Sequence, residues 1–373
     1  MAARTTPPFR ADHVGSLLRP PELLRAREDA AAGRIGADEL RTVEDEAIRA
    51  AVRMQEQVGL RSATDGELRR SSWHMDFIYA LDGISTADDK VKVSFHNEEG
   101  DIDFMAAALH VSGKVGVSQT IFGDAFRFLQ GCVSTATPKL TIPSPSMVHY
   151  RGGRAAIDEA VYPDLDSFWS DLTAAYREEV RRLGELGCTY LQLDDTSLAY
   201  LNDPEQQRYV ASIGRDPERQ HVEYIRHINE ALEGRPPGMS VTTHMCRGNF
   251  RSSWVAEGGY EHVAEALFHE LDVDGYFMEW DDERSGGFEP LRLLPPGPKQ
   301  VVLGLVTTKR GALESKDDLK RRVEEASRYA SLDQLCLSGQ CGFSSTVEGN
   351  ALTYDEQVAK LRLVVEVAEE VWT

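Results

Sequence analysis

The chain contains the run Ser240-Val241-Thr242-Thr243-His244-Met245-Cys246-Arg247-Gly248, β-branched residues followed by a turn signal. Such a run is typical of a buried strand that leads into a loop. Successive side chains of a strand alternate between its two faces, so His244 and Cys246 are predicted to point the same way. An imidazole and a thiol side by side can supply half of a zinc site. On its own, the pair is better explained as a packed core cysteine beside an ordinary histidine, so the other half must come from elsewhere in the chain.

Eight segments of the chain share this form, a short apolar run that ends in a polar or glycine-rich loop. Their last residues are Ser16, Glu67, Ser144, Asp194, Cys246, Glu279, Val306 and Cys341. Between them, apolar residues recur at helical spacing, for example in residues 37–58, 165–186 and 354–371. Strands that alternate with helices in this way predict an α/β protein, a (β/α)8 barrel of the TIM type. No Gly-x-Gly-x-x-Gly follows the first strand, which argues against a dinucleotide-binding sheet.

Residues 85–135 do not fit this alternation of strands and helices. Residues 91–95 and 113–118 alternate between apolar and polar side chains, which predicts accessory strands. No glycine- or serine-rich linker divides the chain. We therefore predict one catalytic domain, residues 1–373, with a hairpin-like insertion at about 85–135.

Composition and charge exclude several classes of function. The 373 residues carry 61 acidic against 41 basic side chains, a formal charge of -20, which argues against binding to nucleic acid or to an acidic membrane. No run is apolar enough to span a bilayer, and the first residues do not resemble a signal peptide, so we expect a soluble, cytoplasmic protein. The five cysteines are an odd, sparse set, which argues against a disulfide framework and leaves metal binding or catalysis open, and the lack of a CxxC pair argues against a closed four-cysteine zinc site.

The predicted barrel brings a set of reactive side chains to one place. Chemistry in such barrels lies at the carboxyl ends of the strands. The side chains expected there are Ser16, Glu67, Asp194, His244, Cys246, Glu279 and Cys341. Each has an ordinary structural role available, as a rim carboxylate, a helix cap or a turn residue, but those roles explain the joint occurrence poorly. Two thiols, one imidazole and one carboxylate form a donor set that suits zinc.

In this order, the residues resemble the cobalamin-independent methionine synthase family, in particular its C-terminal catalytic domain as found in short stand-alone members. His244-Met245-Cys246 looks like the family's His-x-Cys zinc pair. Glu279 in Phe-Met-Glu-Trp and Cys341 in Gln-Cys-Gly match its other two zinc ligands. The resemblance covers nearly the whole chain and implies a bound zinc ion.

The resemblance also implies the reaction, that of a 5-methyltetrahydropteroyltriglutamate–homocysteine methyltransferase. A zinc-dependent S-methyltransferase of this kind holds homocysteine, or a similar thiol, as a zinc thiolate and converts it to methionine or another thioether. Ser16 would bind the substrate carboxylate, and Glu67 and Asp194 are the expected catalytic and substrate-binding carboxylates, paired with its ammonium group. Asp195 either supports that site or caps the next helix. A homo-oligomer is also compatible with the sequence.

The chain departs from the family where the methyl donor is expected. The family places a proton-donating histidine just after the seventh strand, and residues 306–310 read Val-Thr-Thr-Lys-Arg instead. A folate nitrogen is a poor leaving group unless it is protonated. An acidic folate-binding position of the family corresponds to Tyr200. The donor therefore stays open between a methyl-folate and a methylated corrinoid protein.

Three other functions remain open from the sequence. An epoxyalkane–coenzyme M transferase uses the same zinc chemistry, but its thiol carries a sulfonate and no amino group, which leaves Glu67 and Asp194 without a cationic partner. A metal-dependent hydrolase barrel prefers histidine and carboxylate ligands around a bound water, which two thiolates disfavour. The third is a zinc-binding barrel with no catalytic activity.

Overall fold

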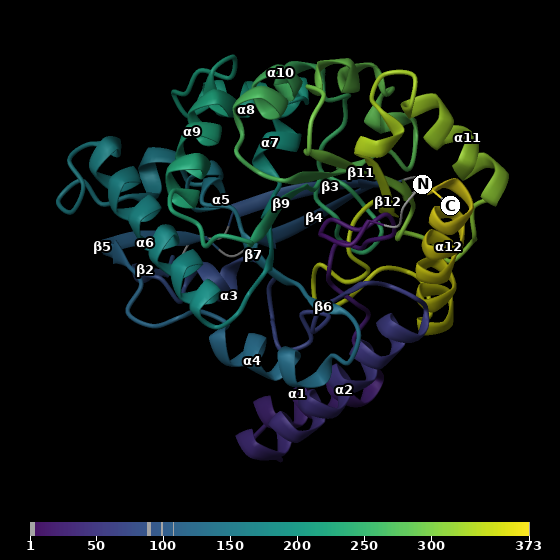
Figure 1. Ribbon diagram of the computed structural model, residues 1–373. Helices are drawn as coiled ribbons and strands as arrows, with labels where there is room; N and C mark the ends of the chain where they lie inside the picture. Colours follow the sequence, from purple (N-terminus) through teal and green to yellow (C-terminus); the bar gives the residue numbers. More distant parts are fainter. Residues whose placement is uncertain (1–3, 88–90, 98–99, 107, 373) are drawn as a thin grey trace.

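A parallel sheet of six strands forms most of the barrel in the computed structural model, which describes residues 4–87, 91–97, 100–106 and 108–372 (Figure 1). Strands that are adjacent in the sheet are also consecutive in the chain. In chain order they are β7 (Leu140–Pro143), β8 (Tyr190–Asp195), β9 (Ser240–Met245), β10 (Gly275–Glu279), β11 (Gln300–Val306) and β12 (Leu335–Gly339). All are buried along almost their whole length, as expected for strands covered by helices on the outside of a barrel.

Two short segments close the ring between β12 and β7. Ala11 forms a parallel bridge with Leu337 of β12. On the other side, β1 (Ser62–Ala63) pairs in parallel with β6 (Thr137–Pro138), which leads into β7. The Leu17 N–H donates to the Gly66 carbonyl at 3.0 Å, which joins the two segments to each other. The TIM-barrel prediction is confirmed.

The first two strands are shorter than the sequence predicts. The expected strand that ends at Ser16 is reduced to the bridge at Ala11, because the Asp12 carboxylate accepts from the N–H groups of Phe9, at 3.1 Å, and His13, at 2.8 Å. Backbone donors that are paired with a side chain cannot extend a ladder. The second strand stops at Ala63, well before the predicted end at Glu67, which has φ of 58°.

Helices surround the sheet, and their buried faces follow the spacing seen in the sequence. Residues 37–58, 165–186 and 354–371 were predicted as helices and correspond to α2, α6 and α12. The described residues contain no helix that is long and apolar enough to cross a membrane. The α-helices are α1 (Pro21–Ala31), α2 (Ala37–Gln57), α3 (Met75–Ile78), α4 (Gly123–Cys132), α5 (Ser146–Tyr150), α6 (Leu165–Glu185), α7 (Ser197–Tyr200), α8 (Pro204–Ser212), α9 (Gln220–Leu232), α10 (Glu261–Glu270), α11 (Lys316–Ala326) and α12 (Tyr354–Trp372).

Among the described residues between 82 and 116, strands form two antiparallel pairs outside the barrel sheet. In one, β2 (Asp82–Thr86) pairs with β5 (Leu109–Gly116), and in the other, β3 (Val91–Asn97) forms a hairpin with β4 (Gly100–Ala106). The hairpin packs on the loop that follows β9, where His96 and Trp254 exchange backbone hydrogen bonds of 2.6 and 2.9 Å. The accessory strands thus lie beside the carboxyl end of β9. That the whole chain is one domain with an insertion at 85–135 stays a prediction.

Candidate active site

Four of the predicted residues meet at the carboxyl ends of three strands. His244 lies near the end of β9 and Cys246 directly after it, Glu279 ends β10, and Cys341 lies in the loop after β12. One ligand atom from each residue lies within 4.8 Å of all the others. The two sulfur atoms are 3.4 Å apart, and every one of the four side chains is buried. We call these residues the quartet.

The backbone holds the two thiols toward each other. The Cys246 N–H donates to the Asp195 carbonyl at 2.9 Å, so strand pairing with β8 continues one residue past the end of β9. The Gly248 N–H then turns back to the Cys246 sulfur at 3.4 Å. On the other side, Gly342 follows Cys341 in a tight approach to Ser16, where a Cβ atom would overlap the serine hydroxyl. Glycine is required there because any side chain would push the Cys341 loop away.

The quartet has donor atoms that the protein itself leaves unused. Both ring nitrogens of His244 are buried without a hydrogen-bond partner among the described residues. Cys246 shares its proton with Cys341, which lowers the pKa of the Cys341 thiol well below its usual range and raises that of Cys246. Leaving a buried polar nitrogen unpaired costs about 1–3 kcal/mol, which a bound ligand would offset. Two sulfurs, one nitrogen and one oxygen at this separation fit a zinc ion.

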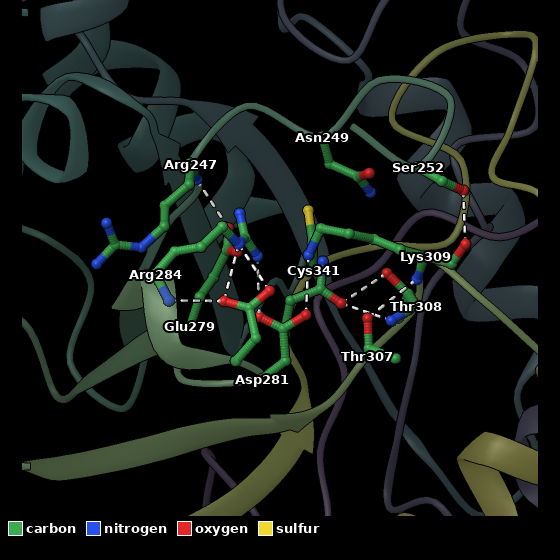
Figure 2. Close-up of polar contacts among 12 residues, drawn as sticks. Arg247, Asn249, Ser252, Glu279, Asp281, Arg284, Thr307, Thr308, Lys309 and Cys341 are labelled. Atoms are coloured by element: carbon green, nitrogen blue, oxygen red, sulfur yellow. Dashed lines mark hydrogen bonds and ion pairs between the residues drawn. The ribbon is translucent and has the colours of Figure 1, made fainter. Parts of the chain in front are cut away.

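Charged residues surround the quartet on the Glu279 side (Figure 2). The Glu279 carboxylate accepts the Arg247 N–H at 2.7 Å, and burial is the main cause that raises its pKa. Next to it, Asp281 lies between the Lys309 ammonium, at 2.9 Å, and the Arg284 guanidinium, at 3.2 Å. Lys309 thus points to Asp281 from the segment where the resemblance would place a proton-donating histidine.

The three predicted substrate residues line the same cavity as His244 and both quartet thiols. Glu67 accepts from the Thr141 hydroxyl at 2.8 Å and lies 3.6 Å from the buried Arg70 guanidinium. Burial, and then the charge of Glu67, raise the pKa of Asp194 to about 7. Ser16 Oγ accepts the Ser344 N–H at 3.4 Å. Two buried carboxylates, one of which raises the pKa of the other, form a subsite suited to a cation.

Residues 9–370 match the family model described as the catalytic domain of cobalamin-independent synthase. The chain belongs to this family. Membership makes the protein a methyltransferase of the methionine synthase type, as the resemblance implied.

Several relatives are similar to this chain over most of their own length. YxjH from Bacillus subtilis, a protein of uncharacterised function, is 46% identical over 98% of this chain and 95% of its own. A Listeria monocytogenes structure, solved as a candidate vitamin-B12-independent methionine synthase, is 37% identical, covers 99% of this chain and 100% of its own, and superposes with a TM-score of 0.79. The methionine synthase of Pyrococcus abyssi is 22% identical over 88% of this chain and 84% of its own.

Asp195, which the sequence left between two roles, acts as a structural residue. One carboxylate oxygen accepts from the Ser197 hydroxyl at 2.7 Å and from the Leu198 N–H at 2.9 Å, at the start of α7. The other accepts from the Ser146 hydroxyl at 2.5 Å, at the start of α5. Asp195 therefore joins two helix starts, while its neighbour Asp194 faces the cavity.

The sequence did not reveal the rest of the cavity wall. Phe95 and Phe104 of the hairpin contact Phe250 with ring centroids 5.0 and 4.7 Å apart, and all three line the cavity. Arg151 and Trp73 also line it. The alternation in residues 91–95 predicts a strand with one apolar face. Local spacing does not predict that this face packs on the loop after β9.

Proposed function

We propose that the protein is a zinc-dependent S-methyltransferase that converts homocysteine to methionine. The observation that carries the proposal is the quartet, whose unused donor atoms face the same cavity as Ser16, Glu67 and Asp194. A metal with an exchangeable position and a subsite for an amino acid are the two parts that this reaction requires. The family and the name of the Pyrococcus abyssi relative support the same assignment.

His244, Cys246, Glu279 and Cys341 would hold the zinc ion. Bound zinc stabilises the substrate sulfur as a thiolate, whereas a free thiol with a pKa of about 8.5 is mostly protonated at neutral pH. Glu279 is the carboxylate of the quartet, and the Arg247 N–H binds it at 2.7 Å, closer than the 3.4 Å from the Gly248 N–H to the Cys246 sulfur. That hydrogen bond gives the carboxylate a partner of its own, so Glu279 is the residue best able to yield its place to the substrate.

Glu67, Asp194 and Ser16 would recognise the amino-acid end of the thiol. An ammonium group between the two carboxylates would relieve their mutual repulsion and replace the water lost by burial. Ser16 Oγ, beside the Ser344 N–H, would bind the carboxylate. A sulfonate-bearing thiol such as coenzyme M has no ammonium group for this subsite, which favours homocysteine. The methyl donor, a methyl-folate or a methylated corrinoid protein, is left to the experiment.

The test is to incubate the zinc-loaded protein with homocysteine and either methyl-folate or methylcobalamin, and to identify products by mass. Matched reactions replace homocysteine with coenzyme M, with and without an epoxide. We expect methionine from at least one donor and no thioether of coenzyme M. A thioether formed only from coenzyme M would transfer the assignment to the epoxide reaction, and no thioether from any pair would overturn the transferase proposal.

A further inference from the structure

Arg151 is an arginine in the cavity wall whose charge the protein does not neutralise. It follows α5, and its backbone carbonyl accepts a hydrogen bond from the Tyr209 hydroxyl. Its Nε atom is buried without a partner, and among the described residues no carboxylate lies within ion-pair distance of its guanidinium. Arg70, a buried arginine outside the lining of this cavity, by contrast lies 3.6 Å from Glu67 and donates to the Thr141 carbonyl at 2.7 Å. A half-buried guanidinium without a counter-charge is suited to an anion from outside the chain.

Arg151 stands where two cavities meet. The inner cavity contains the quartet thiols, and a second, outer one lies beyond β3 and α8. Val93, Arg151 and Tyr200 line both of them. The outer cavity is otherwise lined by Lys92, Ser94, His96, Tyr150, Glu205, Gln206, Tyr209 and Val255. Glu205 is the only acid among these described residues, and it is exposed on α8. A molecule that reaches the quartet from the outer cavity would pass the guanidinium.

Two neighbours of Arg151 add neutral hydrogen-bonding groups. The Tyr200 hydroxyl is buried without a partner among the described residues, and burial raises its pKa, so it stays protonated and can donate. It lies against Gly248, where a Cβ atom would overlap the hydroxyl, two residues from Cys246. His74 lines the inner cavity, and burial followed by the charge of Arg151 lowers its pKa to about 3. Arg151 therefore has two neutral neighbours, the Tyr200 hydroxyl and the His74 ring, and no described carboxylate forms an ion pair with it.

We propose that Arg151 and the Tyr200 hydroxyl form a subsite for an anionic oxyacid group, a carboxylate or a phosphate, on the methyl donor. The identity of the bound molecule as the donor rests on the proposed function. The thiol substrate has its own polar partners in Glu67, Asp194 and Ser16, so the guanidinium without a counter-charge in the same cavity lining is left for the second substrate. The anionic group would stop at the junction of the two cavities while the methyl group extends toward the quartet.

The subsite can be tested without catalysis. The zinc-loaded protein is titrated calorimetrically with inorganic phosphate and, separately, with acetate, at an ionic strength fixed with sodium chloride. We expect one of the two anions to bind, with an affinity that falls about tenfold or more in Arg151→Gln and is partly restored in Arg151→Lys. Tyr200→Phe should weaken binding less. Arg208→Gln is the matched control, because Arg208 is exposed on α8 and lines neither the inner nor the outer cavity.

The two anions distinguish a phosphate-bearing from a carboxylate-bearing donor, and zinc content verifies that each variant retains the metal site. Equal affinities in wild type, Arg151→Gln and Arg208→Gln, or no binding above chloride, would overturn the subsite. The kinetic counterpart is a KM for the methyl donor that rises in Arg151→Gln while the KM for homocysteine does not. If an anion binds through Arg151 but no donor yields a thioether, the transferase proposal is overturned and the subsite stands. If methionine forms but the KM for the methyl donor does not change in Arg151→Gln, the subsite is overturned and the transferase proposal stands.

Discussion

Buried polar clusters lie at both ends of the barrel, and two of them, one from each end, differ in what they leave unpaired. At the amino ends of the strands, the Asp12 carboxylate accepts from the Ser62 hydroxyl at 2.8 Å and the Tyr190 hydroxyl at 2.9 Å, and lies 3.5 Å from the Lys139 ammonium. At the carboxyl ends, His244 of the quartet has no partner for either ring nitrogen among the described residues. The first cluster is complete without a ligand, and the second is not.

The difference distinguishes polar groups that are buried to stabilise the fold from polar groups that are buried to bind a ligand. Asp12 joins three segments, residues 9–13, β1 and β8, where the first strand provides a single bridge, so its bonds replace missing ladder contacts. Burial lowers the pKa of Lys139, and Asp12 counteracts that shift. A buried ion pair of this kind is costly to break, because the partner that remains is an unpaired charge. In the quartet the unpaired groups are already present, so removing one should cost little stability and most of the function.

Asp12→Ala tests the complete cluster and should have the largest effect on stability. It leaves Lys139 as a buried charge without its carboxylate, and the free energy of unfolding in urea should fall by about 3–5 kcal/mol. Zinc content per folded molecule should not change. If the variant does not fold, Tyr190→Phe removes one hydrogen bond and should cost about 1 kcal/mol. Wild-type stability in both variants would show that this cluster does not hold the barrel closed.

Cys246→Ser and Cys341→Ser test the incomplete cluster. Each removes one sulfur donor, and zinc affinity should fall by about 100-fold or more, which corresponds to about 2.8 kcal/mol. The free energy of unfolding of the zinc-free protein should stay within about 1 kcal/mol of wild type, because the serine hydroxyl can still donate and accept in place of the thiol, whose hydrogen bonds are long, 3.4 Å to the other sulfur and to the Gly248 N–H. Zinc is measured by mass spectrometry after dialysis.

Cys336→Ser is the matched control for both variants. Its sulfur is fully buried on β12 and lies 3.7 Å from Gln300 Oε1, far from the quartet in the fold, at the other end of the strand. We expect it to retain zinc. Unchanged zinc in the two quartet variants, or equal loss in all three, would contradict the assignment of the ligands.

The quartet could be predicted from the sequence, and the Asp12 cluster could not. His244, Cys246, Glu279 and Cys341 follow strands that are apolar along their length, so strand periodicity alone placed them at one end of a barrel. The Asp12 cluster was not predicted. Its partners come from segments whose strands are too short to show a period, and a carboxylate that replaces ladder hydrogen bonds leaves no local pattern.

The cavity wall illustrates the same limit. Trp73 and Arg151 line the cavity from loops, and the periodicity of a sequence does not predict where a loop turns. The hairpin presents Phe95 and Phe104 to the cavity because backbone bonds between His96 and Trp254 fix it there, a long-range pairing. Asp195, in contrast, has the form of a helix cap in the sequence, and the structure gives it that role.

Glu67→Gln tests the smallest of the three effects, the charge that the amino-acid subsite provides. The amide can still accept from the Thr141 hydroxyl, which now lies 2.8 Å from the carboxylate, so the fold should persist. With one carboxylate fewer for the ammonium group, the KM for homocysteine should rise about tenfold, the loss of about one charge-assisted hydrogen bond. Steady-state kinetics at saturating methyl donor would measure it.

The pH profile of the same variant distinguishes a charge effect from a packing effect. Asp194 must be ionised to bind an ammonium group, and its pKa of about 7 predicts that kcat/KM for homocysteine rises as the pH increases through about 7. Burial and the charge of Glu67 both raise that pKa, so removing the charge lowers it and should move the acid limb of Glu67→Gln to lower pH. A variant that merely loosened the site would raise KM at every pH and leave the limb in place. An unmoved limb would therefore show that Glu67 and Asp194 do not share one cation, and the incomplete cluster would be a metal site without the amino-acid subsite proposed beside it.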